Sequence, residues 1–178
     1  MLTITIPETE CYDQINNLFF TIKSQTITME HSLVSISKWE SKWKRPFLEK
    51  KPKSNAEMQD YYRCMTLTQN VDPIIYSIIP KEQIKEINRY IEDPMTASTV
   101  KEEKKNGSGK ITSELIYYWM VALEIPFECQ KWHLNRLLML IRICQAKNAP
   151  QKKMSKKDVA NQYRALNEQR KAALHTTG

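Results

Sequence analysis

The chain has 178 residues, a formal net charge of +7 at pH 7 and 41% hydrophobic residues. This length suits one globular domain with a tail, and the hydrophobic fraction excludes a fibrous or low-complexity protein. With only 3 glycines and abundant Glu, Lys, Gln, Leu and Met, the composition predicts a mainly α-helical fold. The positive charge favours an anionic partner, such as nucleic acid, an acidic protein surface or a lipid headgroup layer.

The four cysteines are scattered along the chain, without the close pairing of a zinc site or the density of a small secreted scaffold. We expect them to be reduced thiols of a cytosolic protein. The N-terminal stretch MLTITIPETE has no cationic region followed by an apolar run, so no signal peptide is predicted.

Residues 1–30 are predicted to form an N-terminal β segment. Both LTITI (Leu2–Ile6) and FFTIKSQTITM (Phe19–Met29) are rich in β-branched and apolar residues, with Pro7 and polar residues between them. We predict two or three short strands that form a small β-hairpin or sheet. Because so small a sheet is marginal alone, it needs helices or a partner to pack against.

Residues 31–147 are predicted to form a helical core domain. The first helix is expected to begin after Ser32 as its N-cap and to end before Pro46. We assign Glu40 and Lys44 to its outer face. Its apolar stripe, at three- to four-residue spacing, consists of Leu33, Ile36, Trp39 or Glu40, and Trp43.

Further helices are predicted beyond this first one. Asn55 is expected to cap the second helix, and Pro73 and Pro80 each start another, since proline suits the first helical position. Residues 94–110 hold two of the three glycines and many charges, so we predict a mobile linker there.

The most apolar part of the chain extends from Ser113 to Cys144. Glu124 and Pro126 interrupt it, so it does not supply the about 20 uninterrupted apolar residues of a transmembrane helix. We expect no membrane partner. We predict instead two helices joined at Pro126, the first starting at Thr112 or Ser113, that form a helical hairpin at the core.

Residues 148–178 are predicted to form a basic C-terminal helical extension. Ser155, followed three residues later by Asp158, resembles a capping arrangement and predicts a helix from about Lys156 to Leu174. Because its apolar stripe is thin, we expect this helix to be loosely attached and to order on a partner.

Motifs for catalysis or metal binding are weak. Cys129 and His133 stand at i and i+4 on a predicted helix, but a zinc site needs three or four ligands. The stretch NGSGK (Asn106–Lys110) lacks the glycine spacing of a phosphate-binding loop. We therefore expect no metal, no cofactor and no enzymatic activity.

Two basic runs remain as candidate binding surfaces. Lys38–Lys53 alternates lysines with aromatic residues, as single-strand binders do, although a buried aromatic face beside a solvated lysine face explains this spacing better. The C-terminal run suits either phosphates or an acidic protein. Its candidate binding residues are Lys152, Lys153, Lys156, Lys157, Arg164 and Arg170.

Four long segments of the chain are distinctive: EHSLVSISKWESKW (Glu30–Trp43), MTLTQNVDP (Met65–Pro73), ELIYYWMVALEIPFECQKWHLNRLLMLIRIC (Glu114–Cys144) and KKMSKKDVANQYRALNEQRKAALHTTG (Lys152–Gly178). Through these segments the chain resembles the tail assembly chaperones of long-tailed bacteriophages and prophages. The resemblance covers most of the chain and is weakest in the linker.

This resemblance implies a non-enzymatic assembly factor in the cytoplasm of the bacterial host. Such chaperones bind the long, aggregation-prone tape measure protein and help to recruit tail tube subunits around it. They are typically absent from the finished virion. Homo-oligomerisation stays open at this point.

Client helices are expected to dock in an apolar groove through aromatic anchors. The residues that we assign to this groove or to the core are Trp39, Trp43, Tyr117, Tyr118 and Trp132. The alternative function is that of a basic, nucleic-acid-binding phage structural or packaging protein. Salt distinguishes the two, because contacts to phosphates weaken steeply as the salt concentration rises.

Overall fold

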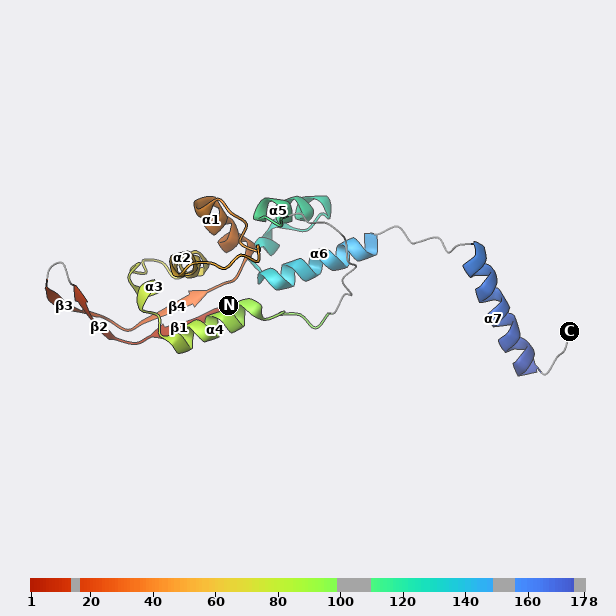
Figure 1. Cartoon of the computed structure of the whole chain (residues 1–178), viewed down its shortest axis with the longest axis horizontal. Coiled ribbons are helices and arrows are strands. Elements are labelled where there is room, and N and C mark those ends of the chain that lie inside the picture. Colours follow the sequence, from red (N-terminus) through yellow and green to blue (C-terminus); the bar gives the residue numbers. More distant parts are fainter. Residues whose placement is uncertain (14–16, 99–109, 149–155, 175–178) are drawn as a thin grey trace. The chain divides into compact units, whose positions relative to one another are not determined.

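The computed structural model (Figure 1) describes residues 1–13, 17–98, 110–148 and 156–174. Contacts between residues divide the chain into two units, residues 1–146 and 147–178. Helices take 56% and strands 15% of the described residues, which confirms the predicted mainly α fold with a small N-terminal sheet. None of the described helices is both long and apolar enough to cross a membrane.

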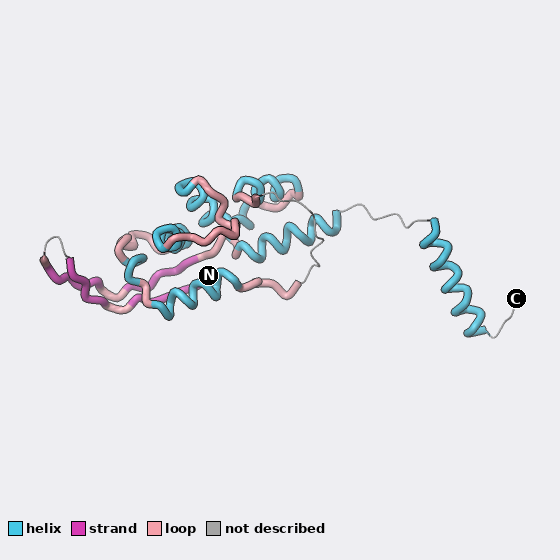
Figure 2. Tube along the Cα trace, viewed as in Figure 1, coloured by secondary structure: helices cyan, strands magenta, loops and turns pink. Residues whose placement is uncertain are grey.

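The N-terminal strands form one long hairpin that is interrupted in the middle. Strand β1 (Leu2–Ile6) pairs with β4 (Gln25–Met29), and β2 (Thr9–Asp13) pairs with β3 (Leu18–Ile22), both antiparallel. The sequence predicts two or three strands, whereas the described residues hold four. The interruption includes Pro7, which has no N–H to donate across a strand pair. Figure 2 shows β2 and β3 extending away from the helices.

The β1–β4 pair has one apolar and one threonine-rich face, as expected because side chains alternate along a strand. Its outer face contains the opposed pairs Thr3–Thr28 and Thr5–Thr26. The other edge of β4 is covered by the loop that follows helix α2 (Asn55–Met65), where Leu67 N–H donates to Thr28 O at 2.8 Å. The apolar face is buried in the core through Ile4, Ile6, Ile27 and Met29.

Helix α1 (Leu33–Trp43) begins after Ser32, as predicted, with a capping box between Ser32 and Ser35. The predicted cap of helix α2 (Asn55–Met65) is wrong by one residue. Ser54 is the N-cap, because its hydroxyl accepts from the Glu57 amide while the Glu57 carboxylate accepts from the Ser54 amide.

The outward position predicted for Glu40 is wrong. This side chain is buried, and its two carboxylate oxygens accept hydrogen bonds from Phe47 N–H and Ser113 N–H, each at 2.7 Å. Ser113 is the first residue of helix α5 (Ser113–Ala122), whose N-terminal amides have no partner within the helix. Glu40 therefore fixes the start of α5 against α1.

Helices α3 (Ile75–Ile78) and α4 (Lys81–Glu92) follow the two prolines that the sequence singles out. Pro80 precedes α4 as its N-cap instead of occupying its first position. Pro73 also stands before its helix. Both prolines thus mark helix starts, but α4 begins one residue and α3 two residues later than predicted.

The second half of the apolar segment does not form one continuous helix. Helix α5 begins at Ser113 with Thr112 as its N-cap, which agrees with the predicted start at Thr112 or Ser113. After Pro126, however, a short 3-10 helix η1 (Phe127–Lys131) precedes α6 (Leu134–Asn148). Between them the chain pairs with the residues before α1, where Leu134 N–H donates to the His31 carbonyl at 2.7 Å.

The predicted helical hairpin therefore forms only part of the core. Helices α5 and α6 contribute Ile116, Met120, Leu134, Leu137 and Ile141. However, the strands and helices α1 and α2 contribute equally large, fully buried side chains, among them Trp39 and Tyr61. The core is shared between the sheet and the helices of residues 1–146.

In the second unit, helix α7 (Lys156–Leu174) has the predicted bounds. Its side chains from residue 160 to 174 are exposed. Residues 99–109 of the predicted linker and the predicted cap Ser155 lie outside the described residues.

Candidate functional site

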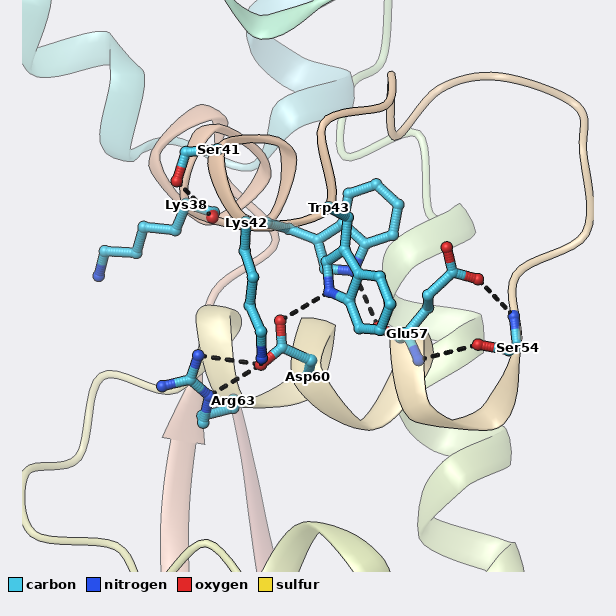
Figure 3. Close-up of polar contacts among 9 residues, drawn as sticks. Lys38, Ser41, Lys42, Trp43, Ser54, Glu57, Asp60 and Arg63 are labelled. Carbon is cyan, nitrogen blue, oxygen red and sulfur yellow. Dashed lines mark hydrogen bonds and ion pairs between the residues drawn. The ribbon is translucent and has the colours of Figure 1, made fainter.

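A carboxylate between helices α1 and α2 organises the candidate site (Figure 3). Asp60 Oδ1 accepts from Lys42 Nζ at 2.6 Å and from Arg63 Nε at 3.0 Å, and Asp60 Oδ2 accepts from Trp43 Nε1 at 2.9 Å. Figure 3 shows these three side chains pointing toward Asp60, while Lys38 extends away from it. One carboxylate thus orients two cations and an indole ring.

Helical spacing brings the partners together. Lys42 and Trp43 lie at the end of α1, and Asp60 and Arg63 are i and i+3 on α2, so they share one face of that helix. The side chain of Asp60 is only 7% exposed, whereas those of Lys42 and Arg63 are 54% and 52% exposed. The anion is therefore inside and the cations are at the surface.

The electrostatics of Asp60 follow from these contacts. Burial by itself would raise the pKa of the carboxyl, but the hydrogen bonds from its three partners outweigh burial, so the pKa is lower than usual. The same contact raises the pKa of Arg63. Asp60 is consequently ionised at neutral pH, and with its two cations the cluster has a net charge of +1.

A shallow depression of about 390 Å³ opens beside this cluster. Lys42, Trp43 and Arg63 line it on the α1–α2 side, and Pro73 and Tyr76 line it on the α3 side. Its wall is therefore partly aromatic and its rim is cationic. We call these residues, with Asp60, the α1–α2 site.

The candidate aromatic residues divide between core and surface. Trp39 is fully buried and donates from Nε1 to the Glu57 carbonyl at 2.8 Å, so it belongs to the core. Trp43 is partly buried, stacks on Trp39 with ring centroids 6.1 Å apart, and reaches the α1–α2 site.

The other three aromatic candidates lie on or next to α5 and η1. Tyr118 is 65% exposed, and Val121, one helical turn further along α5, is 61% exposed. Tyr117 is partly buried and donates from its hydroxyl to Gln130 Oε1 at 2.9 Å. Trp132 is partly buried beneath the guanidinium of Arg136, 4.4 Å from the ring centroid. Of these, only Tyr118 offers most of its side chain to a partner.

The basic candidates belong to the C-terminal segment. Arg164 and Arg170 are exposed on α7. Lys156 and Lys157 begin that helix, and their side chains are not among those described. The remaining two candidates, Lys152 and Lys153, lie outside the described residues.

Sequence reasoning missed two surface features. The first is the Lys42–Asp60–Arg63 cluster, whose only sequence signal is the i, i+3 pair of opposite charges on α2. The second is the β2–β3 hairpin, where Tyr12 packs on Phe19 with ring centroids 4.8 Å apart. Its exposed large apolar side chains are Tyr12, Leu18, Phe19 and Phe20. The absence of apolar–polar alternation in LFFTI was a usable signal for this second feature.

The buried histidines form a structural contact. His31 and His133 have ring centroids 5.1 Å apart, and His133 Nε2 is 2.9 Å from the Tyr90 carbonyl. Burial, with a smaller effect from the charge of His133, lowers the pKa of His31 to about 3. His31 is therefore neutral and packed at physiological pH.

The i, i+4 arrangement predicted for Cys129 and His133 on one helix is wrong. Cys129 lies in η1, whereas His133 stands just before α6, after the extended residue Trp132. Among the described residues, no group of three or more His, Cys, Asp or Glu side chains is arranged to hold a metal ion.

Comparisons of the chain with protein-family models, with curated proteins and with solved structures give no match.

Proposed function

We propose that this protein is a non-enzymatic tail assembly chaperone of a long-tailed bacteriophage or prophage. In this proposal it binds the tape measure protein in the host cytoplasm, helps to recruit tail tube subunits and leaves before the virion is complete. The resemblance of four long segments supports the family. Three residues of the α1–α2 site, Lys42, Trp43 and Pro73, lie within two of these segments.

One observation carries the proposal from the structure. The β2–β3 hairpin exposes four large apolar side chains, Tyr12, Leu18, Phe19 and Phe20, and α5 exposes Tyr118 and Val121 one turn apart. Exposed apolar patches are typical of surfaces that bind other proteins. Several small contacts suit a chaperone that must later be displaced, because each contact is weak alone and strong only in combination.

Helix α7 fits the same proposal as a basic C-terminal extension. Its apolar side chains Tyr163, Leu166 and Leu174 are exposed, as expected for an amphipathic helix that awaits a partner. Binding of α7 to the client would bury these apolar side chains and neutralise part of the positive charge of the helix.

The test is co-expression with the tape measure protein of the same genome. We expect the tape measure protein to be soluble with this chain and to aggregate without it. A matched variant with Tyr118→Ser on α5 should fold and rescue less of the client, because Tyr118 is not part of the core. A tape measure protein that stays insoluble at every expression ratio would refute the proposal.

A second function, nucleic-acid binding, is supported by the exposed basic residues Arg164, Arg170 and Lys171 on α7. Exposed Lys and Arg side chains can neutralise phosphates, and affinity that depends on such contacts falls steeply as the salt concentration rises. Binding of a duplex that weakens by orders of magnitude between low and moderate salt, together with failure to bind the tape measure protein, would favour this function.

A further inference from the structure

In the α1–α2 site, Lys42 and Arg63 each have N–H donors that Asp60 does not use and that could bind a second anion. Lys42 donates one of its three N–H groups to Asp60. Arg63 contacts Asp60 Oδ1 through two nitrogens, Nε at 3.0 Å and Nη2 at 2.9 Å. Among the described residues, no other hydrogen-bond acceptor contacts these two side chains, although Lys42 Nζ also lies 5.6 Å from the centroid of the Trp43 ring. Because Asp60 already holds both cations in place, a new anion would bind them without first having to order them.

The wall of the depression determines what kind of anion fits. Trp43 presents an indole ring whose N–H is occupied by Asp60, and Pro73 and Tyr76 complete an apolar wall. A carboxylate on an amphipathic peptide would bind the cations while its apolar neighbours cover this wall. Asp60 is the only carboxylate among the lining residues, and it is buried behind the cations, so repulsion of an acidic ligand is offset.

We infer that the α1–α2 site binds an acidic, amphipathic segment of a protein partner, with Lys42 and Arg63 as the residues that contact its carboxylate. Nucleic acid fits less well, because only two cations line the depression and Trp43 stacks on Trp39 within the protein. Backbone recognition of nucleic acid instead uses an extended row of cations. This inference rests on the proposed function, and it adds the chemical class of the client segment.

The test compares two capped peptides of about 20 residues, long enough to be helical. One has a leucine stripe flanked by glutamates, and the other has glutamine at the same positions. Fluorescence of the protein's four tryptophans, titrated with each peptide at moderate salt, reports binding, and the substitutions below locate it. We expect the glutamate peptide to bind about tenfold more tightly, as charge-assisted hydrogen bonds are stronger than neutral ones.

Substitutions assign the effect to the site. Lys42→Gln and Arg63→Gln should each reduce the preference for glutamate to about threefold or less, since one of two charge-assisted contacts is lost. Lys85→Gln is the matched control, because Lys85 lies on α4, is 69% exposed and pairs with Glu82 alone among the described residues. In Lys42→Gln, Asp60 still accepts hydrogen bonds from Trp43 and Arg63, so we expect at least this variant to fold.

Equal binding of the two peptides would overturn the inference, as would a preference that survives both substitutions. Tighter binding of a single-stranded oligonucleotide that is lost in the same variants would also overturn it. If the tape measure protein binds but the peptides do not differ, this inference fails while the proposed function stands. If the peptides differ as expected but the tape measure protein does not bind, the site stands and the client of the proposed function is wrong.

Discussion

His31 makes the stability of the fold dependent on pH. Its pKa is lowered from 6.5 to about 3, first by burial and then by the charge of His133. Between these values the unfolded chain binds a proton that the folded chain does not, so acid favours unfolding and stability rises with pH. The contribution is fully present above about pH 6.5 and is lost as the pH falls toward 3.

We therefore expect the free energy of unfolding to fall by up to about 1.4 kcal/mol per pH unit below pH 6.5. Urea unfolding between pH 7 and pH 5 measures this slope, in a range where carboxylates contribute little. His31→Gln should flatten the profile in this range, even where it lowers the stability at pH 7. A wild-type profile that is flat from pH 7 to pH 5 would contradict the assignment.

Glu40 is the residue at which the position predicted from the sequence differs most clearly from the position in the structure. Its position in the stripe of α1 allows an inward side chain, but its charge favours the surface. The structure places it inside because two amides, on Phe47 and Ser113, need an acceptor there. Both amides are supplied by other segments of the chain, and Ser113 is 73 positions away, so no local pattern predicts this contact.

Glu40→Ala should destabilise the protein by about 2–5 kcal/mol, since it leaves two buried amides without acceptors. Urea unfolding gives the loss, and hydrogen exchange should show faster exchange of the Ser113 amide. Glu86→Ala, at an exposed position of α4, is the control and should change little. If both variants are equally stable, Glu40 does not fix α5 as described.

At the scale of whole elements, the positions of most helices could be predicted from the sequence, whereas the connections between them could not. Periodicity and the caps Ser32 and Thr112 locate α1 and α5, since these signals are local. The split between η1 and α6 escapes the pattern because it depends on a backbone pairing of Ser32 with His133, which are distant in sequence. The same holds for the α1–α2 site, which needs two helices to meet.

The β2–β3 hairpin is the element whose role is easiest to test alone. Phe19 is 70% exposed and contacts Tyr12 within the hairpin. Phe19→Thr keeps a residue that favours strands, so the free energy of unfolding should change by less than about 1 kcal/mol. Binding of the tape measure protein should weaken several-fold in a pull-down. The hairpin has no part in client binding if this variant binds as the wild type does.

The molecule as a whole combines a packed unit, residues 1–146, with apolar and basic surfaces that the described contacts leave uncovered. The core was foreseeable in kind from hydrophobic content and helix periodicity. The proposed function rests on the resemblance to tail assembly chaperones, because binding surfaces carry no motif as specific as a catalytic one. The exposed apolar and basic side chains are surfaces that the proposed client would need.

The size of the complex with the tape measure protein tests this account most directly. We would measure its mass by light scattering after co-purification, at low salt and at about 0.5 M salt, where exposed charge pairs are largely screened. The account predicts a mass that includes both the chain and the tape measure protein, retained at high salt because apolar contacts carry most of the binding. No bound copies, or complete dissociation at high salt, would contradict it.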